Sequence, residues 1–419
     1  MKLDLNPDLS AEQAFFAGTT RQFLDDKVPT SLLRELRGDP AGFGRDFWRQ
    51  GADLGWTSLL VPEADGGGSV SGQGLRDLAL VAFEFGRYAA PGPLTTANVV
   101  TAAVARSGTA RQKAELLPGL MTGDLIGSWA YAEPRPFERL GAVGLRARPS
   151  NGHSNGHSNG HSNGQYVLTG HKAPVESAGQ ADLFLVTALL VTECDEDPGT
   201  GGLVQFLVPA DTPGVSVRRM HTLDISRRYG HVVFDDATVP ASAVLGEAGT
   251  VAAGTVAAGG EAAAGTVAGD VERQLQIALV IQLAELTGAM DRGLELTTEW
   301  LFNRYSFGRP LASYQALKHR FADMRAWLEA AHALADAAAR HVQEESGRAG
   351  EYVSAGKSVL GAAALEVLQE CVQFHGGIGV TFEHDLHLYL RRATVDAQLY
   401  GTVADHRERL TAILEANDG

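Results

Sequence analysis

The segment from Asn303 to Arg320, NRYSFGRPLASYQALKHR, combines residue types that can bind an anion. Arg304 precedes a compact turn between two runs of helical apolar periodicity. Gln315 and His319 lie four residues apart, so they share one face of the second predicted helix. A guanidinium, backbone amides and a helix start together suit a phosphate group. An ordinary helix connection with solvated arginines has the same spacing, so this segment alone leaves both interpretations open.

A second segment, VQFHGGIGV at Val372–Val380, places three glycines directly after a predicted helix. Glycine lets a backbone approach a ligand closely. Together the two segments resemble the acyl-CoA dehydrogenase family, in which both contact FAD. GWTSLLVPEADGGG at Gly55–Gly68 and GRPLASYQALKHRFADM at Gly308–Met324 are also typical of that family. Four motifs in the expected order extend the resemblance over nearly the whole chain.

The resemblance implies roles for individual residues. In the family, Arg-x-x-Phe-Gly with a later Gln contacts the FAD of a neighbouring subunit, and Gln-x-x-Gly-Gly supplies further contacts. The matching residues here are Arg304, Ser306, Phe307, Gln315, Gln373, Gly376 and Gly377. The implied reaction removes an α-proton from an acyl-CoA thioester and transfers a hydride from the β-carbon to the flavin. The implied partners are an electron-transfer flavoprotein or similar acceptor, and further subunits in a homo- or hetero-oligomer, either a dimer or a tetramer.

The order of predicted elements indicates an α+β fold that is mainly α. Helical patterns occupy residues 1–125, and short β-prone runs punctuated by Gly, Pro, Asp and Asn occupy 126–245. Four long amphipathic patterns follow in 271–419, which favours an antiparallel four-helix bundle. The resemblance implies the same three parts: an N-terminal helical domain, a middle β-barrel domain and a C-terminal bundle.

Two low-complexity segments interrupt this plan. Residues 149–164 contain three copies of Asn-Gly-His-Ser, with His153, His157 and His161 spaced four apart. A helix would align these imidazoles for a metal, but the intervening Gly and Asn residues disfavour helix. We therefore expect a flexible surface insertion and no metal site. Residues 246–270 are rich in Ala and Gly, and we interpret them as an expanded linker.

Composition excludes several classes of function. The 419-residue chain has a net charge of −15, so its surface as a whole would repel nucleic acid, and any CoA site must be locally basic. Cys194 and Cys371 form no motif. The polar, acidic N-terminus is unlike a signal peptide, and no apolar run is long enough to span a membrane. A reducing cytoplasm is the simplest expected location.

The catalytic base of the family is missing from both of its usual places. The Tyr-Glu-Gly-Thr stretch corresponds to Tyr400-Gly401-Thr402, with Thr402 at the base position or the Glu deleted. The alternative place, on the first bundle helix, corresponds to Ala278. Glu272 lies six residues earlier, about 9 Å away along a helix. It is the leading local candidate, and the competing interpretation is a solvated acid favoured by the helix dipole.

The segments that would hold FAD in this chain's own cleft also depart from the family. Thr-Glu-Pro becomes Ala132-Glu133-Pro134, the following Gly-Ser-Asp is replaced, and the flavin-covering Trp-Ile-Thr becomes Pro174-Val175-Glu176. Three hypotheses remain open. The chain is a divergent acyl-CoA dehydrogenase, a non-catalytic subunit of a heteromeric one, or a flavin-dependent monooxygenase on the same scaffold.

Overall fold

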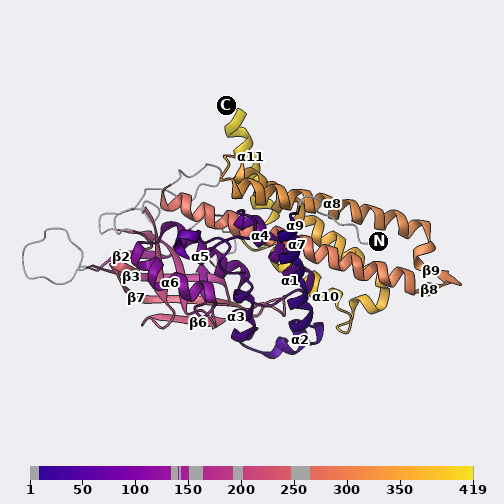
Figure 1. The fold of residues 1–419 in the computed structure, drawn as a ribbon, viewed down its shortest axis with the longest axis horizontal. Coiled ribbons are helices and arrows are strands. Elements are labelled where there is room, and N and C mark those ends of the chain that lie inside the picture. Colours follow the sequence, from indigo (N-terminus) through magenta and orange to yellow (C-terminus); the bar gives the residue numbers. More distant parts are fainter. Residues whose placement is uncertain are drawn as a thin grey trace, which may run out of the picture.

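A computed structural model describes residues 9–133, 140, 143–150, 164–191, 202–246 and 265–418. The fold is α+β and mainly helical, with one curled sheet beside a bundle of long helices, as predicted (Figure 1). The His-containing repeats and most of the Ala/Gly-rich segment lie outside the described residues, as does Cys194. None of the described helices is both long and apolar enough to cross a membrane.

The N-terminal part is helical. A capping box between Ser10 and Gln13 begins the first helix, as their spacing predicts. One helix, Leu94–Ser107, is buried on all sides and therefore has no amphipathic stripe that would mark it in the sequence. The helices are α1 (Ala11–Lys27), α2 (Thr30–Glu35), α3 (Arg45–Asp53), α4 (Gly74–Tyr88), α5 (Leu94–Ser107) and α6 (Ala110–Thr122).

The middle of the chain forms a seven-stranded sheet in the order β1-β4-β2-β3-β7-β6, with β5 paired to β4. The strands are β1 (Gly127–Ala130), β2 (Arg146–Pro149), β3 (Gln165–Glu176), β4 (Leu183–Leu190), β5 (Gly202–Pro209), β6 (Val215–Arg219) and β7 (Tyr229–Pro240). The β-prone run Tyr166–Thr169 predicts a third strand that ends at Thr169, and this end is wrong. The chain stays paired with β7 to Glu176, although Gly, Pro and charged residues hide the alternation.

The C-terminal part is the predicted four-helix bundle, made of α7, α8, α9 and α11, with α10 as an additional short helix. The first bundle helix begins at Val267, earlier than the predicted Val271, because Thr266 caps it by accepting from the Gly269 amide. The elements are α7 (Val267–Asn303), β8 (Tyr305–Ser306), β9 (Arg309–Pro310), α8 (Gln315–Gln343), α9 (Ala349–His375), the 3₁₀ turn η5 (Gly376–Val380), α10 (Leu386–Asp396) and α11 (Val403–Asp418).

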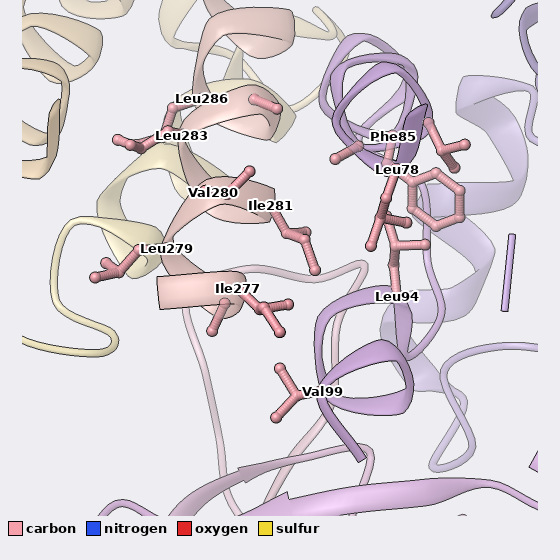
Figure 2. Packing of buried hydrophobic residues seen from close by; sticks show 14 of the residues in the cluster. Leu78, Phe85, Leu94, Val99, Ile277, Leu279, Val280, Ile281, Leu283 and Leu286 are labelled. Carbon is pink, nitrogen blue, oxygen red and sulfur yellow. The ribbon is translucent and has the colours of Figure 1, made fainter. Parts of the chain in front are cut away.

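One continuous hydrophobic core joins the N-terminal helices to the bundle. Figure 2 shows apolar side chains of α4 and α5 facing those of α7, among them Phe85 and Ile281. Two glycines allow α4 and α7 to approach closely. A Cβ at Gly86 would stand 2.0 Å from the Glu285 carbonyl oxygen, and one at Gly288 would stand 2.0 Å from that of Phe83. The two helices therefore cannot separate without opening the core.

Candidate functional site

The segment with residue types that could bind an anion lies at the exposed end of the bundle. After α7 the chain reverses through the β8–β9 hairpin, which Figure 1 shows at the end of the bundle away from the sheet. The two loop residues, Phe307 and Gly308, have φ values of 48° and 78°, as in the primed turns of tight hairpins. The Phe307 side chain is 96% exposed at the tip. The hairpin therefore projects an aromatic ring into solvent.

Trp300 connects the two motifs. The Arg304 guanidinium lies 5.7 Å from the centre of the Trp300 ring. The indole nitrogen of Trp300 donates to the Phe374 carbonyl at 3.2 Å, and its ring stacks on His375 at 5.1 Å. His375 directly precedes the glycine segment. The structure thus brings Arg304 and the Gly376–Gly377 backbone to the same end of the bundle.

The glycine segment presents open backbone. Gly376 has φ 64° and ψ −137°, a conformation that only glycine adopts readily. No heavy atom from elsewhere in the described chain lies within 4 Å of the position of a Cβ at Gly376 or Gly377. Gln373, one turn earlier on α9, is exposed. These residues have the space and the donors to contact a ligand or a neighbouring chain.

Gln315 is the first residue of α8, and its amide nitrogen lies 2.9 Å from His319 Nε2. The two side chains share one face of α8, as their spacing predicts, and both are exposed. Ser306 lies in the hairpin, where its carbonyl accepts from the Tyr314 hydroxyl at 2.8 Å. With Arg304 close by, the positive end of the α8 dipole forms a surface that fits an anionic group such as a pyrophosphate.

Neither usual base position holds a carboxylate. Thr402 caps α11: its hydroxyl donates to Asp405 Oδ2 at 2.8 Å and accepts from the Asp405 amide. Ala278 is fully buried within α7. The interpretation of Glu272 as a solvated acid in the first helical turn is wrong, because its side chain is 13% exposed and paired with Arg409 of α11. It also accepts from Gln276 at 2.8 Å. These contacts connect α7 to α11.

A buried ionic cluster lies where the sheet meets the bundle. Arg227, in the loop before β7, hydrogen-bonds to Glu285 of α7. Its guanidinium also lies 3.4 Å from Glu176 at the end of β3 and 3.6 Å from Asp396 at the end of α10. All four side chains are at most 3% exposed. We call these residues the Arg227 cluster.

Two more cations support the Arg227 cluster from its edges. Arg392 Nε donates to Asp224 at 2.7 Å, and Arg392 Nη2 donates to the Ala89 and Ala90 carbonyls. Lys357 is fully buried, and its ammonium donates to Gln282 and to the Asp396 and Leu399 carbonyls. These contacts fix the chain between α10 and α11, where the usual base would stand.

Burial sets the titration of this region. It raises the pKa of Glu176 and of Glu285, although Arg227 opposes both shifts. It raises the pKa of Asp396 to about 7 and lowers the pKa of Lys357 to about 7. Both oxygens of Asp396 and Oε2 of Glu285 lack a hydrogen-bond partner among the described residues. With Asp224, the region holds four buried carboxylates but only three buried cations, namely Arg227, Arg392 and Lys357. This excess of negative charge favours one uncharged acid at neutral pH.

An aromatic stack lies beside the cluster. Trp129 packs on Tyr131 with ring centres 4.7 Å apart, and on Tyr400 at 5.6 Å. Burial raises the pKa of Tyr400 well above its usual value, and the Glu176 charge adds to the shift. Sequence reasoning missed Arg227, Glu285 and Asp396. The one available signal was a charged residue inside an apolar run, as Glu285 is in LVIQLAEL.

Two cavities lie elsewhere. The larger, about 880 Å³, lies between α1, α4, α7 and α8, and many of its charged side chains pair with one another, as Arg21 does with Glu84. The smaller, about 440 Å³, has apolar residues such as Ile277 and Val61 and charged ones such as Arg273. Neither is lined by the hairpin end of the bundle or by the Arg227 cluster.

Three domain models of one family match the chain in order. They describe the acyl-CoA dehydrogenase N-terminal domain at residues 10–124, the middle domain at 154–237 and the C-terminal domain at 270–414. An acyl-CoA dehydrogenase of Bacillus subtilis is 28% identical, with 83% of this chain and 84% of that protein aligned. Acyl-CoA dehydrogenase IpdE2 of Mycobacterium tuberculosis is 27% identical over 95% of this chain and 96% of its own length.

Solved structures have the same fold. The butyryl-CoA dehydrogenase of Megasphaera elsdenii superimposes with a TM-score of 0.82 at 23% identity, covering 97% of this chain and 99% of that one. A variant of the Tcur3481-Tcur3483 steroid ACAD has a TM-score of 0.79 at 27% identity, with 97% and 99% covered. The second of these is an assembly of two different chains by its name.

Proposed function

Because this chain belongs to the acyl-CoA dehydrogenase family, we propose that it is one subunit of an FAD-linked acyl-CoA dehydrogenase that acts with a partner subunit. The main support is a contrast. The exposed residues that match the family's FAD contacts, Arg304, Gln315, Gln373, Gly376 and Gly377, are present, and we call them the exposed edge; the catalytic base is absent. Family members are oxidoreductases that act on the CH–CH group of acyl-CoA thioesters. A bound FAD would supply the hydride-accepting chemistry, and an electron-transfer flavoprotein or a similar acceptor would take up the electrons.

The exposed edge would bind the cofactor of a neighbouring subunit. Arg304 has no carboxylate partner among the described residues, so its fork is free to bind a pyrophosphate in a bidentate manner. The Gln373 side-chain amide and the first amides of α8 add uncharged donors, whereas the Gly376 amide already donates to the Gln373 carbonyl. This chain's own residues would therefore bind and orient the cofactor at a subunit boundary.

The α-proton would be removed by a carboxylate of the partner. The Thr402 hydroxyl is a poor proton acceptor near neutral pH, and the Ala278 side chain has no proton acceptor. Glu272 is paired with Arg409 and accepts from Gln276, so its carboxylate is already engaged within this chain. The relationship to the two-chain steroid ACAD, at 27% identity, supports an assembly of two different subunits.

Flavin retention tests the edge. Arg304→Lys should lower the FAD content of the purified assembly, because a point charge cannot replace a bidentate fork. Arg309→Lys is the matched control: Arg309 lies in the same hairpin, but its guanidinium stacks on Tyr314 at 3.9 Å. Equal FAD content in the two variants and the wild type would contradict the assignment.

Activity of the single chain tests the missing base. We expect no α,β-dehydrogenation of a panel of acyl-CoAs by the purified chain with added FAD and an artificial acceptor, and rescue by the partner subunit. Robust turnover that survives Glu272→Gln would refute the need for a partner. Turnover that Glu272→Gln abolishes, with flavin still bound, would identify Glu272 as the base.

A further inference from the structure

Three segments that depart from the family converge at one place in the fold. The end of β1 with Glu133, the end of β3 with Glu176, and the turn at Tyr400–Thr402 are far apart in sequence. The Ala173 amide donates to the Ala132 carbonyl at 2.9 Å, and Tyr400 stacks on Trp129 of β1. In the family, the first two segments contact and cover the flavin in a chain's own cleft, and the third carries the catalytic base.

The Arg227 cluster closes the space between sheet and bundle. One guanidinium contacts Glu176 of β3 on one side and Glu285 of α7 and Asp396 of α10 on the other. A planar ring inserted between β3 and these helices would have to separate Arg227 from its partners. Breaking a buried ion pair leaves an uncompensated charge, which strongly destabilises a fold.

The neighbouring side chains complete the closure. The Trp129 ring stacks on Tyr131 and on Tyr400, so each tyrosine ring has one face against the indole. Glu133 is engaged as well, since it accepts from Lys172 at 2.7 Å and from the Gly144 and Leu145 amides. Ala132 has no hydroxyl with which to hold the ring, and Glu176, at the other altered position, is paired with Arg227. The residues present do not fit a flavin in this cleft.

We propose that this chain's own cleft excludes flavin, so that an assembly of this chain with its partner holds one FAD for every two chains. This inference rests on the proposed two-subunit function. The FAD lies in the partner's cleft, and this chain contributes only the Arg304 edge. The Arg227 cluster and the aromatic stack take the structural place that a bound ring would fill.

The test is made on the assembly purified from its source through a tag on this chain. FAD released by heat is counted per polypeptide, and hydrogen exchange is compared between FAD-loaded and FAD-stripped assembly. We expect one FAD per two chains, with protection at Tyr305–Pro310 and Gly376–Val380 and none at Gly127–Ala130. One FAD per chain, or FAD-dependent protection at Gly127–Ala130 or Glu176, would overturn the inference.

The outcomes also separate the inference from the proposed function. If FAD is counted at one per chain while Arg304→Lys still releases it, the function stands and the closed cleft fails. A second outcome would be one FAD per two chains, no FAD-dependent protection at Gly127–Ala130, and full FAD retention by Arg304→Lys. In that case the closed cleft stands and the role of the edge fails. The wild-type hairpin supplies the internal control, since its protection shows that the exchange experiment detects FAD.

Discussion

The hairpin end of the bundle and the Arg227 cluster differ in every physical respect. At the hairpin end, Arg304 and Gln315 are exposed, and the Arg304 guanidinium lies over a Trp ring without a carboxylate partner in the described part of the chain. In the Arg227 cluster, each charge is buried, and the single guanidinium contacts carboxylates from β3, α7 and α10. The first region offers its groups to something outside the chain. The second uses its groups on the chain itself.

The difference shows which kind of site resists change. An exposed residue with few internal partners can be substituted at little cost to the fold, so its identity reports on binding. A buried charge cannot be changed alone, because its partners would remain unpaired. We therefore expect substitutions at the hairpin end to alter assembly and flavin content, and those in the Arg227 cluster to alter stability.

Removal of the central guanidinium should have the largest effect. Arg227→Met leaves three buried carboxylates without their cation, so we expect the free energy of unfolding to fall by about 3–5 kcal/mol. Arg304→Met, at the exposed end, should change it by less than about 0.5 kcal/mol. Urea unfolding followed by Trp fluorescence measures both. Similar values for the two variants would remove the contrast between the regions.

A pH series should sharpen the contrast. The pKa of Asp396 is raised to about 7, through burial and through Glu285 and Asp224, while Arg227 and Arg392 oppose the shift. The folded state thus keeps a proton that the unfolded chain has lost, so this residue's contribution to stability falls as pH rises towards 7. Asn carries no charge at any pH. From pH 5 to pH 8, the free energy of unfolding of Asp396→Asn should therefore rise relative to that of the wild type by on the order of 2 kcal/mol.

Unfolding free energies of both proteins at the two pH values give the result. A constant difference between wild type and Asp396→Asn would mean that Asp396 is not the group that holds the proton. Lys357, whose ammonium donates to the Asp396 carbonyl, shifts in the opposite direction. Its pKa is lowered, so its contribution to stability rises with pH from about 7 upwards.

The smallest effect is expected at the hairpin tip. Phe307 has a positive φ and is almost fully exposed, so its ring adds little to the stability of the single chain. Phe307→Asn gives the Asn-Gly pair favoured in such turns and should stabilise the chain by about 0.5–1 kcal/mol. Phe302→Asn, an exposed Phe in regular helix, should give no gain. A loss of stability at Phe307 would show that its ring packs within its own chain.

The exposed region could be predicted from the sequence because its signals are local. The motif residues, the Gln315–His319 spacing and the glycine run each lie within one short stretch of chain. The Arg227 cluster could not be predicted in this way, since Glu176, Arg227, Glu285 and Asp396 come from four separate stretches. Only tertiary packing brings them together. The end of β3 was missed for the related reason that its buried Glu176 reads as a polar, loop-like residue.

The close approach of α4 to α7 has a consequence for how the chain is made. The glycine contacts join residue 86 to the carbonyl of residue 285, and residue 288 to that of residue 83. At about 5–20 residues per second, α7 leaves the ribosome roughly 10–40 s after α4. During that interval the apolar face of α4, including Leu78 and Phe85, has no partner to cover it. We therefore expect the nascent N-terminal half to depend on chaperones, and a truncated chain that ends before Val267 to aggregate.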